Sequence, residues 1–243
     1  MAAGLVLLLI ALLVWRCVQF MLTLREAIAY PFQIDYGEGI VWQQALLMRP
    51  GTMYGDITRY PFIVFHYPPL YHLVVRAIAG FGMDYLAAGR AVSAGATLAV
   101  AGLLGAITFK GTRATAGRTA ALEASAVAGL IIFTFAPVVV WAPLMRVDML
   151  AVAFSFAGIW CGLMAAERPG FAPLAALAFV AAIFTKQTSL AAPIAIVTAA
   201  SPCQPPTIAP ASIESRSPAA SLTPASGMPC TIWQLTDVQI VAG

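Results

Sequence analysis

The segment YPFQIDYGEGIVWQQALLMRPG, residues 30–51, follows an apolar run over 3–24 and holds Asp35 and Glu38, two of the ten acids in the chain. The rest of the sequence is strongly apolar: 61% of its 243 residues are hydrophobic and only 9% are charged. Soluble domains carry about 25% charged residues, so this composition indicates a membrane protein. The segment therefore decides the topology, because it is the first polar stretch outside the first hydrophobic run.

Several apolar runs are long enough to cross a bilayer as helices, which takes roughly 20 residues. They lie at 3–24, 90–109, 122–142, 148–165 and 171–185, and another begins near 189. The sequence thus predicts an all-α polytopic bundle of five or six transmembrane helices. The first run also resembles a signal peptide, with AIA at 27–29 as a cleavage site, but its length and the absence of a preceding basic residue favour a retained anchor.

The topology depends on the segment 68–83, which is apolar but only about 16 residues long. The basic segment KGTRATAGR (110–118) contains no acid, and we expect it on the cytoplasmic side. With the N-terminus inside, both conditions hold only if 68–83 lies in the interface and does not cross. Residues 25–89 then form one external segment.

This topology gathers the charged candidates on one face of the membrane. The prediction is a multi-pass protein of the plasma (inner) membrane whose candidate site faces the outside or the periplasm. The residues expected on that face are Asp35, Glu38, His66, Arg146, Asp148 and Lys186.

Three readings of Asp35 and Glu38 remain open from the residues alone. Gly37 and Gly39 allow tight turns, and IVWQQALLM (40–48) predicts a short amphipathic helix in the membrane plane. Gln43 and Gln44 lie on its non-apolar side. The acids are then either solvated loop residues, one of which starts the helix, or a general base with a supporting carboxylate. A metal site is the third reading, for which two carboxylates without further ligands are weak evidence.

The other candidates have two readings each. His66 and Tyr67, in FHYPPLYHL (65–73), belong to an interfacial aromatic belt or donate hydrogen bonds to a lipid phosphate or sugar. Arg146 with Asp148 forms a flanking ion pair, and Lys186 reaches the headgroups, or these basic residues bind a phosphate-carrying ligand. External Arg and Lys run against the positive-inside tendency, which favours the phosphate.

The composition changes near residue 200. Residues 201–243 are rich in Pro, Ser and Ala, which predicts a disordered or frame-shifted tail after a transmembrane domain over 1–200. The chain has no run of Lys and Arg of the kind that follows a phosphate backbone, so nucleic acid is not an expected partner.

The order of several motifs resembles the GT-C class of integral-membrane glycosyltransferases. The branch that it resembles contains protein O-mannosyltransferases and lipid A aminoarabinose transferases. The similarity covers about residues 5–200 and follows an N-terminal span. It is carried by DYGEG (35–39), YPPLY (67–71), AAGRAVSA (87–94), RVDMLAVAFSFAGI (146–159) and AAIFTKQTSLAAP (181–193).

The resemblance implies an enzyme that moves a sugar from a polyprenyl-phosphate-linked donor to a lipid, glycan or protein acceptor. It implies that Asp35 is the general base on the acceptor and that Glu38 is its companion, although the family often has the two acids adjacent. Basic residues at external helix ends hold the donor phosphate in such enzymes, and Arg146 and Lys186 match by position. A phosphate leaving group can be stabilised by Arg and Lys, so no metal or cofactor is expected.

Two alternatives remain. One is a non-catalytic membrane protein, such as a small-solute transporter or an assembly subunit, and the other is an inactive truncated fragment. A transporter is expected to carry charged or broken positions at mid-membrane. Arg16 is such a residue, two-thirds of the way along the first predicted span, and it faces either a helix neighbour or a lipid phosphate.

Overall fold

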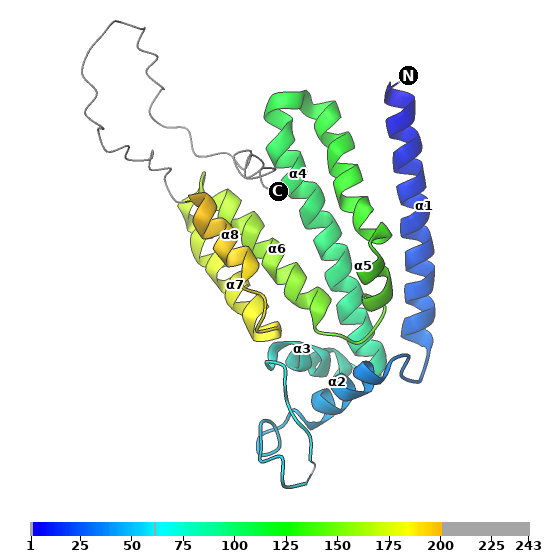
Figure 1. The fold of residues 1–243 in the computed structure, drawn as a ribbon, viewed down its shortest axis with the longest axis vertical. Helices are drawn as coiled ribbons and strands as arrows, with labels where there is room; N and C mark the ends of the chain where they lie inside the picture. Colours follow the sequence, from blue (N-terminus) through cyan, green and yellow to red (C-terminus); the bar gives the residue numbers. More distant parts are fainter. Residues whose placement is uncertain (1, 61, 201–243) are drawn as a thin grey trace, which may run out of the picture. The chain divides into compact units, whose positions relative to one another are not determined.

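The computed structural model describes residues 2–60 and 62–200, and all regular structure within them is helical (Figure 1). The predicted tail lies outside the described residues. Residues up to Pro193 form one compact unit, to which the following description applies. The helices are α1 (Ala2–Ala29), α2 (Tyr36–Leu47), α3 (Leu70–Ala79), α4 (Tyr85–Leu130), η1 (Ile131–Thr134), α5 (Ala136–Trp141), α6 (Asp148–Ala165), η2 (Pro169–Phe171), α7 (Ala172–Thr185) and α8 (Ala191–Ala200).

Helix α1 buries one narrow stripe against α4 and η1. Leu13, Phe20, Leu24 and Ala27 recur at helical spacing and are at most 5% exposed. Phe20 packs on Phe133 of η1 with ring centroids 5.1 Å apart. Most other side chains of α1 are apolar and exposed, which is what a helix facing lipid requires.

Helix α4 folds back on itself at Gly117, whose backbone has φ +79° and ψ 170° (Figure 1). Only glycine adopts this conformation at little cost. The two arms pack closely because small residues face one another: Ser125 donates a hydrogen bond to the Gly105 carbonyl (2.9 Å). A Cβ on Gly129 would lie 2.8 Å from the Ala101 carbonyl oxygen. The basic segment 110–118 was expected to connect two spans as a loop. It is mostly helical, because the only non-helical backbone inside α4 is at Gly117.

The predicted span 122–142 is not one continuous helix. The second arm of α4 ends at Leu130, η1 follows, and Phe135 is extended before α5 begins. Pro137 lies in the first turn of α5, where its missing N–H costs no helical hydrogen bond. The proline therefore divides the span.

Helices α6 and α7 form an antiparallel pair joined by η2. The Phe179 ring fills the space over Gly158, where a Cβ would lie 2.4 Å from a ring carbon. At the η2 end Lys110 binds Glu167 at 2.5 Å. This pairing places Asp148, at the start of α6, and Lys186, just after α7, at the same end of the bundle.

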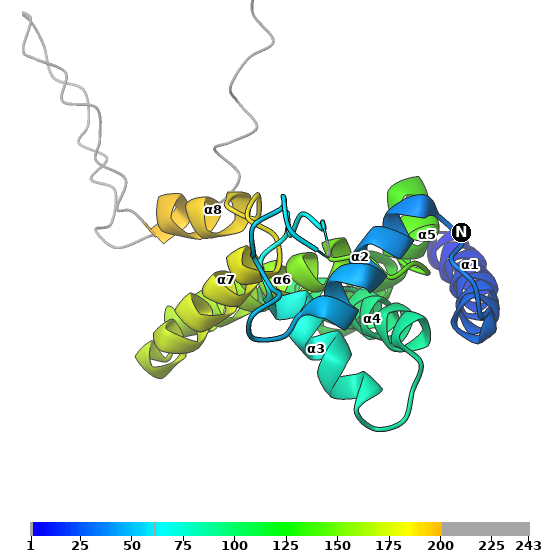
Figure 2. The ribbon, with the colours of Figure 1, turned by 90° about the horizontal axis from the view of Figure 1, so that it is seen from below.

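Three helices in the described part of the chain have the length and composition of membrane spans: Gly4–Ala29, Tyr85–Thr134 and Asp148–Ala165. The chain therefore has the character of a membrane protein, while the full count of five or six crossings is not established. Helix α3, within the segment 68–83, has ten residues and is about 15 Å long, too short to cross. Helices α2 and α3 lie across one end of the bundle (Figures 1 and 2).

Candidate functional site

The end of the bundle covered by α2 and α3 carries four charged side chains in an alternating chain. Arg146 Nη1 lies 3.5 Å from Asp35 Oδ2, and Arg146 Nε lies 3.3 Å from Asp148 Oδ2. Lys186 Nζ lies 2.6 Å from the other oxygen of Asp148. The four side chains retain 23–33% of their accessible surface. We call Asp35, Arg146, Asp148 and Lys186 the charged chain. All four were predicted as site residues from the sequence, and the structure brings them together.

Arg146 occupies the centre of the charged chain and is held by stacking. Its guanidinium carbon lies 4.3 Å from the centre of the Trp141 ring, a cation–π contact that fixes the plane of the group. Its Nη2 has no hydrogen-bond partner among the described residues. Arg146 thus presents donors toward solvent in a fixed orientation.

Glu38 lies in a different environment from Asp35. It is fully buried and forms a two-pronged ion pair with Arg90, which is also fully buried: both contacts are 2.7 Å. The remaining guanidinium hydrogens of Arg90 go to the carbonyls of Ala27, Tyr30 and Phe32. Every donor of Arg90 is therefore used, as a buried cation requires.

The two oxygens of Glu38 also fix the backbone beside the charged chain. Oε2 accepts from the N–H of Ile34 (2.8 Å), and Oε1 accepts from the N–H of Met145 (2.8 Å). These residues immediately precede Asp35 and Arg146. Burial by itself raises the pKa of Glu38, but the hydrogen bonds from Arg90 and the backbone outweigh it and hold the pKa below its ordinary value. Glu38 is therefore an ionised, fully bonded anchor for both segments.

Helix α2 begins earlier than the sequence pattern indicates. Asp35 is its N-cap and accepts from the Gly37 N–H at 2.9 Å. Gly37 and Gly39, expected in turns, are helical, and both are small because neighbours crowd them. A Cβ on Gly37 would lie 2.8 Å from both Arg146 Nη1 and Asp35 Oδ2, and one on Gly39 would strike Gln33.

His66 and Tyr67 lie beside the charged chain without joining it. His66 is exposed and its Nδ1 is 3.1 Å from Gln44 Nε2. Its ring contacts the Tyr67 ring at an interplanar angle of 53°, with the centroids 4.2 Å apart. The backbone carbonyl of His66 accepts from Gln187, the residue after Lys186 (3.2 Å). The loop carrying the two aromatic residues is thereby tied to the end of α7.

Gln44 was expected on the non-apolar side of the helix, but it is fully buried. The expected orientation of α2 was therefore wrong at this residue. The amide nitrogen of Gln44 donates to the Val64 carbonyl (2.7 Å), and its oxygen accepts from His72 Nε2 (3.0 Å). The Nδ1 of buried His72 then carries no proton and has no partner in hydrogen-bond geometry, although the Pro68 carbonyl lies close enough to favour protonation. Burial dominates and lowers the pKa of His72 to about 4, so the ring is neutral at pH 7.

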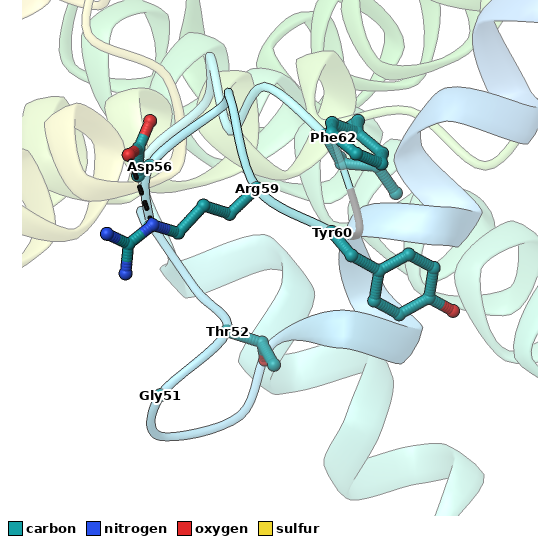
Figure 3. Close-up of a pocket in the computed structure, with 8 residues that line it drawn as sticks. Gly51, Thr52, Asp56, Arg59, Tyr60 and Phe62 are labelled. Carbon is teal, nitrogen blue, oxygen red and sulfur yellow. Dashed lines mark ion pairs between the residues drawn. The ribbon is translucent and has the colours of Figure 1, made fainter.

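A separate hollow of about 210 Å³ lies in the loop that follows α2 (Figure 3). Among its described lining residues Asp56 and Arg59 form an ion pair at 3.6 Å, which is largely exposed. None of the residues predicted for the site lines it. The lining residues are Gly51, Thr52, Gly55, Asp56, Arg59, Tyr60, Phe62 and Ile63.

Within the described residues no group of three or more His, Cys, Asp or Glu side chains is arranged to hold a metal ion. The charged chain instead offers a half-exposed carboxylate next to an arginine and a lysine. Such a set can accept a proton from a ligand and hold an anionic group beside it.

Arg90 is the important residue that the sequence analysis did not select. It lies in AAGRAVSA, at the beginning of the predicted span 90–109, and reads there as an ordinary flanking cation. The available signal was an arginine inside an otherwise small and apolar segment, which needs a buried carboxylate as its partner. Sequence spacing gives no indication that this partner is Glu38, 52 positions away.

Comparison with protein families, with curated proteins and with solved structures gives no match.

Proposed function

We propose that this chain is a membrane glycosyltransferase, or a part of one, that uses a polyprenyl-phosphate-linked sugar as its donor. The observation that carries the proposal is the charged chain, in which the half-exposed carboxylate of Asp35 lies 3.5 Å from Arg146. A base and an anion-binding group are thus placed side by side at one end of a bundle with membrane-spanning helices. The motif resemblance described above gives this chemistry its substrate class.

In the proposed reaction the acceptor hydroxyl or amine gives its proton to Asp35 and attacks the anomeric carbon. The bond from that carbon to the phosphate oxygen breaks, and the polyprenyl phosphate leaves with one additional negative charge. Arg146 and Lys186 stabilise this charge, since both are part-exposed cations of the charged chain. Asp148 orients the two cations by binding both. No step requires a metal or a redox partner.

Glu38 has a positioning role in this proposal and does not share the proton transfer with Asp35. Its oxygens are occupied by Arg90 and by the N–H groups of Ile34 and Met145, which leaves no lone pair directed at an acceptor. It holds the two segments that carry Asp35 and Arg146 at a fixed separation. His66 and Tyr67 border the acceptor side, where the Gln187 contact keeps their loop next to Lys186.

The proposed orientation has α1, both arms of α4, α6 and α7 crossing the membrane in alternating directions. The antiparallel arms of α4 and the α6–α7 pair support this count. The charged chain then lies on the outer face of the plasma membrane, and the basic turn around Gly117 lies in the cytoplasm, in accord with the positive-inside tendency. The lipid phosphate of the donor would lie at the headgroup level, where α2 and α3 cover the bundle.

The test is a transfer assay on the full chain in vesicles, with a radiolabelled polyprenyl-phosphate sugar and membrane acceptors. We expect transfer by the wild type and a loss of at least a hundredfold for Arg146→Gln, because the leaving phosphate loses its fixed partner. Arg59→Gln, an exposed arginine of the neighbouring loop, is the matched control and should retain activity. Donor consumption at equal rates in the wild type, Arg146→Gln and empty vesicles would refute the proposal.

A further inference from the structure

Helix α1 carries a polar stripe on a surface that otherwise faces lipid. Arg16, Gln19, Thr23 and Glu26 are spaced i, i+3, i+7 and i+10, which places them on one side of the helix. Arg16, Thr23 and Glu26 are exposed and Gln19 is half-buried. We call these four residues the polar stripe. It lies beside the buried stripe that contacts α4, and three of its four side chains remain exposed in the described unit.

Arg16 lies deep in the candidate span Gly4–Ala29. It is about 18 Å from the first residue of that span and about 20 Å from the last, at 1.5 Å per residue. A charged side chain at such a depth is costly unless it meets a counter-charge or a water-filled cavity. Among the described residues Arg16 has no carboxylate partner, and its guanidinium binds only Gln19 in the same helix, at 3.0 Å.

A lipid phosphate does not account well for this arrangement. The guanidinium of Arg16 is held one turn along the helix by Gln19, which is itself about 15 Å from Ala29. Headgroup capture also gives no role to the side-chain nitrogen of Gln19, which has no partner among the described residues. The same holds for the Thr23 hydroxyl, which donates only to the Gln19 carbonyl of its own helix (3.2 Å). Amide and hydroxyl side chains in a membrane are typical of contacts between helices, where they hydrogen-bond to a neighbour.

A second copy of the chain does not fit the stripe either. Two copies inserted in the same orientation are related by an axis normal to the membrane, so equal residues meet at equal depth. Arg16 would face Arg16 and Glu26 would face Glu26. Like charges in hydrocarbon oppose such a pair.

We propose that the polar stripe of α1 is the docking face for a transmembrane helix outside residues 2–200, with a carboxylate near its middle and a basic residue near its outer end. The carboxylate pairs with Arg16 and the basic residue with Glu26, ten positions further along α1. Gln19 and Thr23 supply hydrogen bonds between the two pairs. This inference is independent of the proposed transfer activity, because the polar stripe contains none of the charged chain.

The probe is a synthetic Leu/Ala single-span helix with Asp at its centre and Lys ten positions toward one end. Its association with the full chain is measured by energy transfer between fluorophores in phosphatidylcholine vesicles. We expect the Asp-centred probe to bind about tenfold more tightly than a Leu-centred one, as one interhelical polar contact allows. Arg16→Leu should remove this preference, whereas Val14→Leu, at an exposed position on the side of α1 opposite the polar stripe, should retain it.

A charge exchange makes the test specific. Arg16→Asp in the chain should lose the Asp-centred probe and gain a probe with Lys at its centre, with a change of about tenfold in each direction. Three results would overturn the inference: equal binding of the probes, no gain by the exchanged pair, or self-association of the chain that Arg16→Leu abolishes. Probe binding that follows only the content of anionic lipid would also contradict it, since headgroups would then satisfy Arg16.

Discussion

Two acids three residues apart, Asp35 and Glu38, have opposite environments. Glu38 is fully buried, bonded through both oxygens and paired with an equally buried arginine. Asp35 is 30% exposed, and its contact with Arg146 is 3.5 Å long. Glu38 belongs to a network in which every donor and acceptor is used. Asp35 belongs to a more exposed network whose groups remain open to a ligand.

The buried Glu38–Arg90 pair holds the backbone on which the more exposed charged chain is built. Glu38 accepts from the N–H groups next to Asp35 and Arg146, so the buried network sets the spacing of the more exposed one. Preorganised groups of this kind lower the reorganisation needed when charge develops in a reaction. The comparison predicts that changes at Glu38 and Arg90 act mainly on stability, and changes in the charged chain mainly on activity.

The largest effect on stability is expected for Arg90→Met. It leaves the Glu38 carboxylate buried without its partner and three carbonyls without donors. The free energy of unfolding should fall by about 3–5 kcal/mol, measured by denaturant titration in detergent. Arg113→Met, an exposed arginine in α4, is the control. Equal stability of the two variants would break the contrast between the networks.

Acid should destabilise the fold through His72 and then Glu38. The pKa of His72 is lowered from 6.5 to about 4, so between these values the unfolded chain takes up a proton that the folded chain does not. Stability is therefore complete above about pH 6.5 and declines by about 3 kcal/mol toward pH 4. The pKa of Glu38 is lowered from 4.5, so its contribution is lost at still lower pH. The decline due to His72 is measured by the unfolding midpoint at a series of pH values between 7 and 4.

The variant that separates the two histidines is His66→Gln. His66 is exposed, so its removal should leave the decline between pH 6.5 and 4 in place. If the stability of the wild type does not change between pH 6.5 and 4, or if the decline is absent in His66→Gln, His72 is not the group responsible.

Gly37→Ala should reduce activity without loss of stability. The added Cβ lies 2.8 Å from the tips of Asp35 and Arg146, both of which can move aside. Alanine also favours the helix, by about 0.5–1 kcal/mol. Transfer should fall by about tenfold or more, because displaced reacting groups lose their alignment. Gly111→Ala, which meets open space in α4, is the control for both measurements. Full activity of Gly37→Ala would show that the spacing of Asp35 and Arg146 is unimportant.

The smallest effect is expected for Lys110→Gln at the opposite end of the bundle. Its partner Glu167 is 62% exposed, and surface ion pairs contribute at most about 1 kcal/mol. Stability should change by less than that, and transfer should not change. A loss of activity in Lys110→Gln would indicate that the two ends of the bundle are coupled and that activity does not depend on the charged chain alone.

Sequence reasoning located the charged chain but not its support. Topology placed Asp35, Arg146, Asp148 and Lys186 at one end of the bundle because the parity of membrane crossings follows from composition and positive charge. It could not find the Glu38–Arg90 pair, since a contact across 52 positions depends on how α2 packs on α4. The orientation of Gln44 was wrong for a similar reason: two histidines outside α2 decide that it is buried.

The fold was predictable in its class and less so in its segments. An all-helical membrane bundle follows from the apolar runs alone. The turn at Gly117 falls in the basic segment 110–118 between two predicted runs, where hydropathy marks it. The break before Pro137 falls inside a run, where hydropathy does not change. The length of a run thus predicts a span, and glycine and proline decide where that span bends or ends.

In the proposed mechanism Asp35 accepts the proton while Arg146 and Lys186 hold the donor. Asp35→Asn separates these roles when donor binding and sugar transfer are measured in parallel. Asparagine keeps the N-cap of α2 and removes only the basic oxygen, so the fold should remain intact. We predict donor binding within about twofold of the wild type and transfer reduced by about a hundredfold or more. Unchanged transfer in this variant would contradict the account.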